Sequence, residues 1–294
     1  MINENIINKL ILYGCKILRN EFLSKYCSFK IGGPADFLIE IPNEQALFIF
    51  LKNIETNYVL LGNGTNILFS DKGYDGVVLR LTGDFNKIFV SKNKISSGSS
   101  VLLSNILQIA IKNNLVGFEC IAGVPGTVGG AVYGNAGSKD EWISTVINDI
   151  EVYKNLKKEI IKKEDVKFAY RKSNLENCVI TKVNFLLKKK VKNDSLREIS
   201  KNIQNRLKTQ PLDVYSAGSI FKNPSGISVG KLIEKIGLKG KRIGGAQISQ
   251  LHGNFIVNTG GALSRDILSL IDLIKNEVKK RFNINLEMEI KIIE

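Results

Sequence analysis

Residues that bind transition metals are scarce in this sequence. Its 294 residues include four cysteines and one histidine, and no two cysteines form a Cys-x-x-Cys pair. Structural zinc and iron–sulfur sites need clustered thiolates or imidazoles, so the sequence predicts no metal site. Scattered single cysteines are usually small buried hydrophobic residues, and we expect this of all four: Cys15, Cys27, Cys120 and Cys178.

Long apolar runs are also missing. No uncharged stretch approaches the roughly 20 residues needed to span a bilayer, and the first twenty residues lack the basic-then-apolar order of a signal peptide. Only five prolines and 44% apolar residues are typical of packed globular structure. The sequence therefore predicts a soluble cytoplasmic protein without a membrane segment.

Acidic residues are few beside the basic ones. Forty-two Lys and Arg against 28 Asp and Glu give a net charge of +14, which is compatible with nucleic acid, an anionic membrane or small polyanionic ligands. The densest basic runs, 154–167 and 187–194, contain acids or lack aromatic stacking partners, which favours a solvated face. Because no nucleic-acid-binding motif is present, we expect no nucleic-acid partner.

Hydrophobic periodicity predicts an α+β fold. A strand should end at Pro42, and a helix should follow it with Asn43 as its N-cap. A change of pattern after the second basic run predicts a domain boundary near 195–210. One further strand is predicted to start at 58, and others are predicted at 76–81, 87–90, 94–97, 147–154, 177–187 and 286–293. Further helices are predicted at 101–114, 195–208, 227–237 and 264–282.

A short loop rich in glycine and asparagine follows the strand that starts at 58. Consecutive backbone N–H groups in Gly62–Asn66 could bind an anion, and a tight turn with positive φ explains the same residues equally well. The loop matches neither the GxGxxG fingerprint nor a P-loop.

A second glycine-rich stretch, GFECIAGVPGTVGGAVYGNAG, covers 117–137. It contains seven glycines and few charges, which suggests a smooth wall against a flat or extended ligand. Close backbone packing in the core is the alternative, and we expect it to explain only one or two of the glycines.

Seven motifs occur in a fixed order along the chain: KYCSFKIGGPADFLIEI (25–41), LLGNGTNILFSD (60–71), the stretch 117–137, FAYRKS (168–173), SAGSIFKNP (216–224), HGNFIVN (252–258) and LEMEIKII (286–293). Together they resemble one family, the UDP-N-acetylenolpyruvoylglucosamine reductases, which are flavoenzymes of peptidoglycan synthesis. The resemblance runs from about residue 20 to the C-terminus and is to the shorter, second type, without a tyrosine-bearing insertion.

The resemblance implies non-covalent FAD and two domains. Residues 1–200 would form an FAD-binding region of the vanillyl-alcohol-oxidase (PCMH) type, with subdomains at about 1–56 and 57–200, and residues 201–294 a substrate-binding domain. Two loops would hold the diphosphate through backbone donors, and the long glycine stretch would lie along the cofactor. The implied FAD contacts are Ile31, Gly32, Gly33, Pro34, Gly62, Asn63, Gly64, Thr65, Asn66, Gly123, Pro125, Gly126, Thr127, Gly129, Gly130, Ala131, Asn135 and Gly137. Many relatives have serine at the position of Thr65, and threonine keeps the hydroxyl group.

The implied reaction is the NADPH-dependent reduction of UDP-N-acetylglucosamine enolpyruvate to UDP-N-acetylmuramate. Hydride would pass from FAD N5 to C3 of the alkene, and a proton from Ser219 to C2. Arg171 would bind the carboxylate with its fixed fork, and Glu289 would act with it on the developing enol. No obligate protein partner is implied.

Each catalytic assignment has a plainer alternative. Arg171 could form an ordinary surface ion pair, Ser219 could be a loop serine, and Glu289 an exposed strand residue beside the similar Glu287. If Glu289 lines the substrate site, partial burial would raise its pKa. Methionine precedes Glu289 where proline is common in relatives, so the local strand geometry is in question.

The UDP end of the substrate has four candidate contacts. Lys222 and Asn223 follow Ser219 in one motif, and Tyr170 precedes Arg171, although a core aromatic is its alternative. His252 is expected to be structural or to line the substrate site. Two competing functions stay open: an FAD-dependent oxidase of the same fold, and a nucleotide- or nucleic-acid-binding protein without catalysis.

Overall fold

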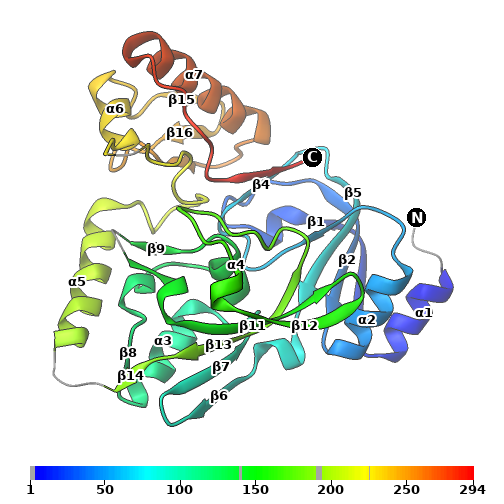
Figure 1. The fold of residues 1–294 in the computed structure, drawn as a ribbon. Coiled ribbons are helices and arrows are strands. Elements are labelled where there is room, and N and C mark those ends of the chain that lie inside the picture. Colours follow the sequence, from blue (N-terminus) through cyan, green and yellow to red (C-terminus); the bar gives the residue numbers. More distant parts are fainter. Residues whose placement is uncertain (1–3, 139–140, 190–193, 225) are drawn as a thin grey trace. The chain divides into compact units, whose positions relative to one another are not determined.

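The chain consists of two compact units, each assembled from separate stretches of sequence. The computed structural model describes residues 4–138, 141–189, 194–224 and 226–294 (Figure 1). Unit 1 contains residues up to Leu18, Phe37–Asn63 and Gly76–Gln204, and unit 2 contains Arg19–Asp36, Gly64–Asp75 and Asn205–Glu294.

In the residues that the structure describes, five α-helices belong wholly or mainly to unit 1. The predicted cap of α2 is confirmed, because the Asn43 side chain accepts a hydrogen bond from Ala46 N at 2.9 Å. The helices are α1 (Glu4–Leu12), α2 (Glu44–Asn53), α3 (Leu103–Lys112), α4 (Val128–Tyr133) and most of α5 (Asp194–Thr209). Short 3-10 helices are η2 (Gly83–Asn86), η3 (Glu119–Ile121), η4 (Ile143–Val146) and η5 (Lys163–Asp165).

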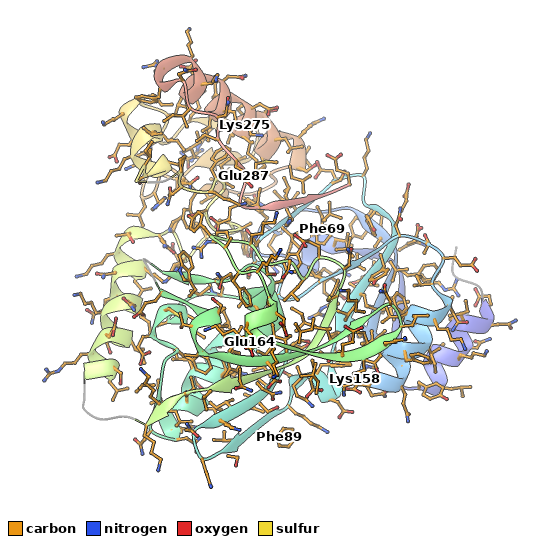
Figure 2. The ribbon with its side chains drawn as sticks, viewed as in Figure 1. Phe69, Phe89, Lys158, Glu164, Lys275 and Glu287 are labelled. Atoms are coloured by element: carbon orange, nitrogen blue, oxygen red, sulfur yellow. The ribbon has the colours of Figure 1, made fainter. Side chains whose placement is uncertain are left out.

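An antiparallel five-stranded sheet forms the centre of unit 1, with the order β12-β11-β13-β7-β6. Its strands are β6 (Ile88–Ser91), β7 (Lys94–Gly98), β11 (Ile147–Lys154), β12 (Lys157–Lys162) and β13 (Val179–Leu186). Helix α3 buries Leu103, Ile106, Leu107 and Ala110, spaced as one helical face, in the same core as Ile150 of β11. Phe89 of β6 is 62% exposed at the sheet edge (Figure 2).

A second sheet has the order β1-β2-β5-β3, in which β3 and β5 are parallel. Its strands are β1 (Lys16–Phe22), β2 (Pro34–Ile41), β3 (Tyr58–Leu60) and β5 (Tyr74–Leu81). In unit 1, Ile39 and Leu79 of this sheet pack in one core with Leu10 of α1 and Leu47 of α2. Two short pairs complete the unit: β8 (Leu115–Val116) with β14 (Lys188–Lys189), and β9 (Gly137–Ser138) with β10 (Glu141–Trp142).

Unit 2 combines the C-terminal residues with two earlier segments. Strand β4 (Ile67–Phe69) pairs in parallel with β18 (Lys291–Ile293), and the Asp71 carboxylate accepts hydrogen bonds from both N and Oγ of Ser264, each 2.7 Å. These contacts fix the start of α7, which spans Ser264–Phe282 as predicted. The other elements are η1 (Leu23–Tyr26), α6 (Val229–Lys235) and the antiparallel strands β15 (Arg242–Ile243), β16 (Ala246–Ile248) and β17 (Ile256–Asn258).

One predicted strand is wrong over most of its length. Of 286–293, only Lys291–Ile293 form a strand, and Met288 makes a single bridge to Phe221. A strand that packs on one side would bury every second residue, but the neighbours Met288 and Glu289 are both partly buried. Residues 286–290 lie beside one short irregular segment instead of a sheet, because their one bridge joins Met288 to Phe221.

Residues 19–36 and 64–75 lie in unit 2, so the units are not consecutive along the chain. The predicted boundary at 200/201 falls close to the boundary at 204/205. The division into an FAD-binding region and a substrate domain stays a prediction. The α+β class is confirmed by the mixed helices and sheets.

The cysteines and the first basic run behave as expected. Cys15, Cys27 and Cys120 are buried and Cys178 is partly buried; burial raises the pKa of Cys15 to about 11 and, with nearby acidic side chains, that of Cys120 to about 12. Most of β12 is exposed. Residues 190–193 of the second run lie outside the described residues.

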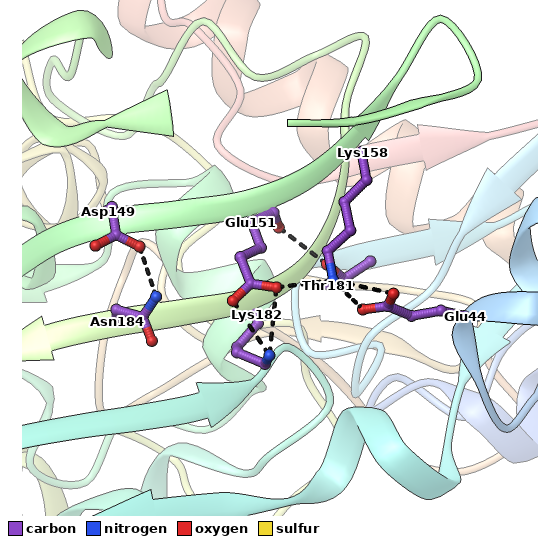
Figure 3. A network of polar contacts seen from close by, with 7 residues as sticks. All are labelled: Glu44, Asp149, Glu151, Lys158, Thr181, Lys182 and Asn184. Atoms are coloured by element: carbon purple, nitrogen blue, oxygen red, sulfur yellow. Dashed lines mark hydrogen bonds and ion pairs between the residues drawn. The ribbon is translucent and has the colours of Figure 1, made fainter. Parts of the chain in front are cut away.

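Lysines of the central sheet are neutralised by acids of unit 1. Figure 3 shows Glu151 of β11 between Lys158 and Lys182, with both ion pairs at 3.1 Å, while Lys158 also reaches Glu44 of α2 at 2.7 Å. Although burial acts to raise the pKa of Glu151, hydrogen bonds from the two lysines lower it. This network joins α2 to the sheet and gives these lysines a structural role.

Candidate active site

The glycine-rich stretch 117–137 forms η3, a turn and the short helix α4 in unit 1. The Thr127 side chain caps α4 by accepting from Gly130 N at 3.3 Å. Val128 N and Gly129 N donate to Val101 O and Ser99 O, each at 2.8 Å. These three N–H groups are therefore used within the protein and are not open to a ligand.

Most glycines of this stretch are required by the fold itself. Gly117, Gly123 and Gly126 have positive φ, which glycine adopts without strain. A Cβ at Gly129 or Gly137 would come within 3.0 Å of neighbouring atoms, so close packing explains about as many glycines as we expected. The remaining two, Gly130 of α4 and Gly134 at the C-terminal end of α4, have room for a Cβ, which would meet nothing closer than 3.4 Å.

Asn135 connects the end of α4 with the FAYRKS motif. Its Nδ2 donates to Ala169 O at 3.0 Å, and its backbone has a φ of 44°. The side chain is buried, and among the described residues no donor reaches its Oδ1. A buried acceptor in this state costs stability unless a ligand or water satisfies it.

These surroundings suit FAD. Gly123, Pro125 and Gly130 are exposed and present bare backbone, against which an extended ligand could lie. The hydroxyl and imide N–H groups of FAD are donors of the kind that Asn135 Oδ1 lacks. The residues present therefore fit the cofactor.

The predicted diphosphate loops are split between the two units. Gly62 and Asn63 belong to unit 1, where a Cβ on Gly62 would come 2.7 Å from Thr127 Oγ1. Gly64, Thr65 and Asn66 belong to unit 2. Each loop is held by residues next to the other: Ser28, three residues before Ile31–Pro34, donates from its N to Gly64 O at 3.0 Å, and Gly33 N donates to Ser70 O, four residues after Asn66, at 2.9 Å.

Arg171 lies in a tight turn in unit 1. Ala169 and Lys172 pair across this turn, and Arg171 has a φ of 54°, which is uncommon for a residue with a side chain. Its Nη1 donates to Gly137 O at 3.2 Å. The guanidinium carbon lies 5.7 Å from the Trp142 ring centre and 5.5 Å from that of Tyr170, so two aromatic rings and a carbonyl orient the cation.

The segments that carry Ser219, Lys222 and Glu289 pair with each other in unit 2. Segment 219–222 runs antiparallel to 287–289, with Lys222 N donating to Glu287 O at 2.9 Å and Glu289 N to Ile220 O at 2.8 Å. Asn66 Nδ2 donates to Glu289 O at 3.1 Å. Ser219 and Glu289 are partly buried.

The two glutamates of this segment differ in surroundings. The Glu287 side chain, labelled in Figure 2, is 73% exposed. It forms an ion pair with Lys222. Glu289 is the more buried of the two, which agrees with its assignment over Glu287.

The other predicted substrate contacts have structural partners. Asn223 Oδ1 accepts from Val229 N at 3.0 Å, at the start of α6, and Tyr170 is 40% exposed beside Arg171. His252 Nδ1 accepts from Asn254 N at 3.2 Å, and burial lowers the pKa of His252. The histidine is therefore part of a structural turn. Within the described ranges no group of three His, Cys, Asp or Glu could hold a metal ion.

Two residues of these sites were missed in the sequence. Trp142 packs beside Arg171, and Asn254 holds the Ser219 segment through its side chain. The sequence does mark both positions, because Trp142 is the only tryptophan and Asn254 is a polar residue next to the apolar run Phe255–Val257. It does not show that Trp142 contacts Arg171 or that Asn254 contacts Phe221.

Comparison with known proteins identifies the class. Residues 45–153 match the family model described as "FAD binding domain", and residues 210–293 match "UDP-N-acetylenolpyruvoylglucosamine reductase, C-terminal domain". The chain is thus an FAD-dependent oxidoreductase with an α+β fold. In the described residues no helix is long and apolar enough to cross a membrane.

Relatives along the whole chain define the family. A UDP-N-acetylenolpyruvoylglucosamine reductase 1 of Bacillus cereus is 38% identical over 99% of both chains, and a reductase of Fervidobacterium nodosum is 40% identical over 99% of this chain and 96% of its own. The crystal structure of the reductase MurB from Thermus caldophilus superimposes with a TM-score of 0.84 at 35% identity, covering 95% of this chain and 99% of that one. The chain belongs to the UDP-N-acetylenolpyruvoylglucosamine reductase family, as its motifs predicted.

Proposed function

We propose that this chain reduces UDP-N-acetyl-3-O-(1-carboxyvinyl)-glucosamine to UDP-N-acetylmuramate with NADPH, in the cytoplasm, as a step of peptidoglycan synthesis. It is then a UDP-N-acetylmuramate dehydrogenase, with NADP⁺ as acceptor in the formal direction. The observation that carries the proposal is the pairing of segment 219–222 with 287–289, because it sets the segment that carries Ser219 and Lys222 beside the segment that carries Glu289 in unit 2. Family membership supports the same reaction.

FAD, when bound, supplies the two-electron hydride carrier between NADPH and the alkene. The protein has to hold it, and the glycine stretch and Asn135 of unit 1 offer bare backbone and an unsatisfied acceptor. Loops Ile31–Pro34 and Gly62–Asn66 are the proposed diphosphate contacts.

Reduction of the alkene places hydride on C3 and a proton on C2. We assign the proton to the Ser219 hydroxyl, and we assign binding of the substrate carboxylate to Arg171, which Gly137 O and two rings orient. A cation held beside the carboxylate stabilises negative charge that develops next to C2 more in the transition state than in the ground state. Glu289 would stabilise the enolic form together with Arg171.

Lys222 and its neighbours would bind the UDP end. In this structure the Lys222 ammonium pairs with the exposed Glu287, so a substrate diphosphate would take the place of a carboxylate that water already screens. Asn223, Tyr170 and His252 would contribute around it. Because Asn223 and His252 already bond to backbone N–H groups, we expect them to shape the site more than to contact the substrate.

Anaerobic stopped-flow absorbance of the FAD-loaded protein tests this function. NADPH should bleach the flavin, and the enolpyruvyl sugar nucleotide should restore its colour with formation of UDP-N-acetylmuramate. Molecular oxygen serves as the alternative acceptor. If oxygen restores the colour quickly and the sugar nucleotide does not, the protein is an oxidase and the proposal is wrong.

A further inference from the structure

The side chain of Asn254 holds the backbone of the segment that contains Ser219 and Lys222. Oδ1 accepts from Phe221 N at 3.0 Å, and Nδ2 donates to Phe221 O at 2.8 Å. We propose that Asn254 is a positioning residue that places the Ser219 hydroxyl and the Lys222 ammonium for the reaction. This inference rests on the proposed function.

The segment is fastened along both sides. On one side Ile220 N donates to the main-chain O of Asn254 at 2.9 Å, and Ser219 bridges Phe255. On the other side it pairs with 287–289. Phe221 N and O point to the side chain of Asn254, so the asparagine replaces a missing strand at this position.

Asn254 is itself fixed in place. Its side chain is 2% exposed, and its backbone N donates to His252 Nδ1 at 3.2 Å. Phe221 is also fully buried, so water cannot substitute for the two bonds without opening the fold. The position of Ser219, two residues earlier, therefore depends on this amide.

The chemistry requires both ends of an amide. Aspartate has the same shape, but it lacks the donor and would place an oxygen against Phe221 O. Serine can donate and accept, but it carries both functions on one oxygen of a shorter side chain and cannot replace the two separate atoms that reach Phe221 N and Phe221 O. Both substitutions should shift segment 219–222 slightly. Neither removes a group that touches the substrate.

The first test uses the two half-reactions of the FAD-loaded protein. In Asn254→Asp we expect reduction by NADPH to keep its wild-type rate, whereas reoxidation by the enolpyruvyl sugar nucleotide slows about 10²-fold, the loss typical of a misplaced reactive group. In steady-state turnover this loss should appear mainly as a lower kcat. KM should rise less, because the displaced Lys222 would bind the substrate more weakly.

Asn258→Asp is the matched control. Asn258 is a buried asparagine four residues later, and its side chain bonds to Phe29 O, Gly260 N and Ala262 N rather than to segment 219–222. Both variants should unfold at lower temperature. If Asn258→Asp slows reoxidation as much as Asn254→Asp, the effect is loss of stability and the inference is wrong.

Hydrogen exchange of the wild-type protein keeps the inference testable if Asn254→Asp does not fold. The Phe221 amide should be protected as strongly as that of Lys222, and Asn254→Ser should lose protection at Phe221 first. Free exchange at Phe221 in the wild type would overturn the inference.

Failure of the inference can be told from failure of the proposed function. If Ser219→Ala blocks reoxidation while Asn254→Asp turns over like the wild type, only the positioning role is wrong. If Ser219→Ala turns over normally, the proton-donor assignment on which both depend is wrong.

Discussion

The two groups of catalytic candidates are held by different forces. Arg171, in unit 1, is oriented by the faces of Trp142 and Tyr170 and by one hydrogen bond to Gly137 O. Ser219, in unit 2, lies in a backbone segment that hydrogen bonds fasten on both sides. The cation therefore depends on neighbouring side chains, whereas the hydroxyl depends on the path of the main chain.

This difference suits the two tasks. Ring faces attract a guanidinium over a range of positions, so Arg171 can adjust to a carboxylate that gains charge during the reaction. Proton transfer needs donor and acceptor at hydrogen-bonding distance, and a rigid segment provides that. Substitutions around Arg171 should give graded losses, and those in the Ser219 segment should give steep ones.

The steepest loss is expected from Ser219→Ala. Removing the hydroxyl removes the proposed proton donor, so reoxidation of the flavin by the enolpyruvyl substrate should slow by about 10²–10⁴-fold. Reduction by NADPH should be unchanged. Stopped-flow absorbance of both half-reactions checks this, with Ser219→Cys as a control that retains a proton. Wild-type turnover by the alanine variant would remove Ser219 from the mechanism.

Arg171→Ala should come next. Loss of one preorganised charge costs about 10²–10³-fold in turnover, while FAD retention, measured by the flavin-to-protein absorbance ratio, should change little. Arg171→Lys separates charge from shape: lysine keeps the charge but lacks the planar fork, and we expect it to recover only part of the rate. Full recovery would show that the fork and its stacking are unimportant.

Local sequence was a good guide to elements that stabilise themselves. Helix α7 begins and ends where predicted because its apolar residues repeat with helical spacing, and α2 begins after Asn43 because a cap acts within one turn. The strand predicted at 286–293 failed because its length depends on a partner. That partner, 220–222, lies more than sixty residues away and is itself irregular.

The sites show the same limit. Motifs pointed to Arg171, Ser219 and Glu289, whose roles stay predictions, but no motif pointed to Asn254, because its partner, Phe221, is 33 residues away. For the glycines of 117–137, the sequence could not show which have positive φ or which lie against Ser99 and Glu141. Their role along the cofactor stays a prediction.

A graded loss is expected from Trp142→Ala. The attraction between the Trp142 ring and the Arg171 guanidinium stabilises the cation by about 0.5–2 kcal/mol. Its loss corresponds to a fall of about 2- to 30-fold in kcat/KM. Trp142→Phe, which retains a ring, should lose less. Because Trp142 is the only tryptophan, its fluorescence should also respond when the substrate carboxylate binds Arg171. If both variants lose activity as steeply as Arg171→Ala, the aromatic contacts are not adjustable and the contrast between the sites fails.

The smallest effect is a pH dependence that should act on unit 2. Burial, and to a lesser degree the positive charge of Lys239, lower the pKa of His252 from its ordinary value of 6.5, while a hydrogen bond to its own backbone and the charge of Glu234 oppose the shift. As pH falls, the unfolded chain takes up this proton first, so the contribution of neutral His252 to stability is complete above 6.5 and is lost as pH falls through the folded pKa.

Protonation of His252 would also remove the acceptor for Asn254 N, which ties this titration to the Ser219 segment. The protection factor of the Phe221 amide, which corrects for the slower intrinsic exchange at low pH, should therefore fall as pH drops below 6.5, while Trp142 fluorescence in unit 1 stays constant. His252→Gln, which keeps a polar side chain but cannot titrate, should abolish this fall. If the protection factor of the glutamine variant falls as it does in the wild type, another group controls the segment, and the backbone around Ser219 does not depend on the His252 turn.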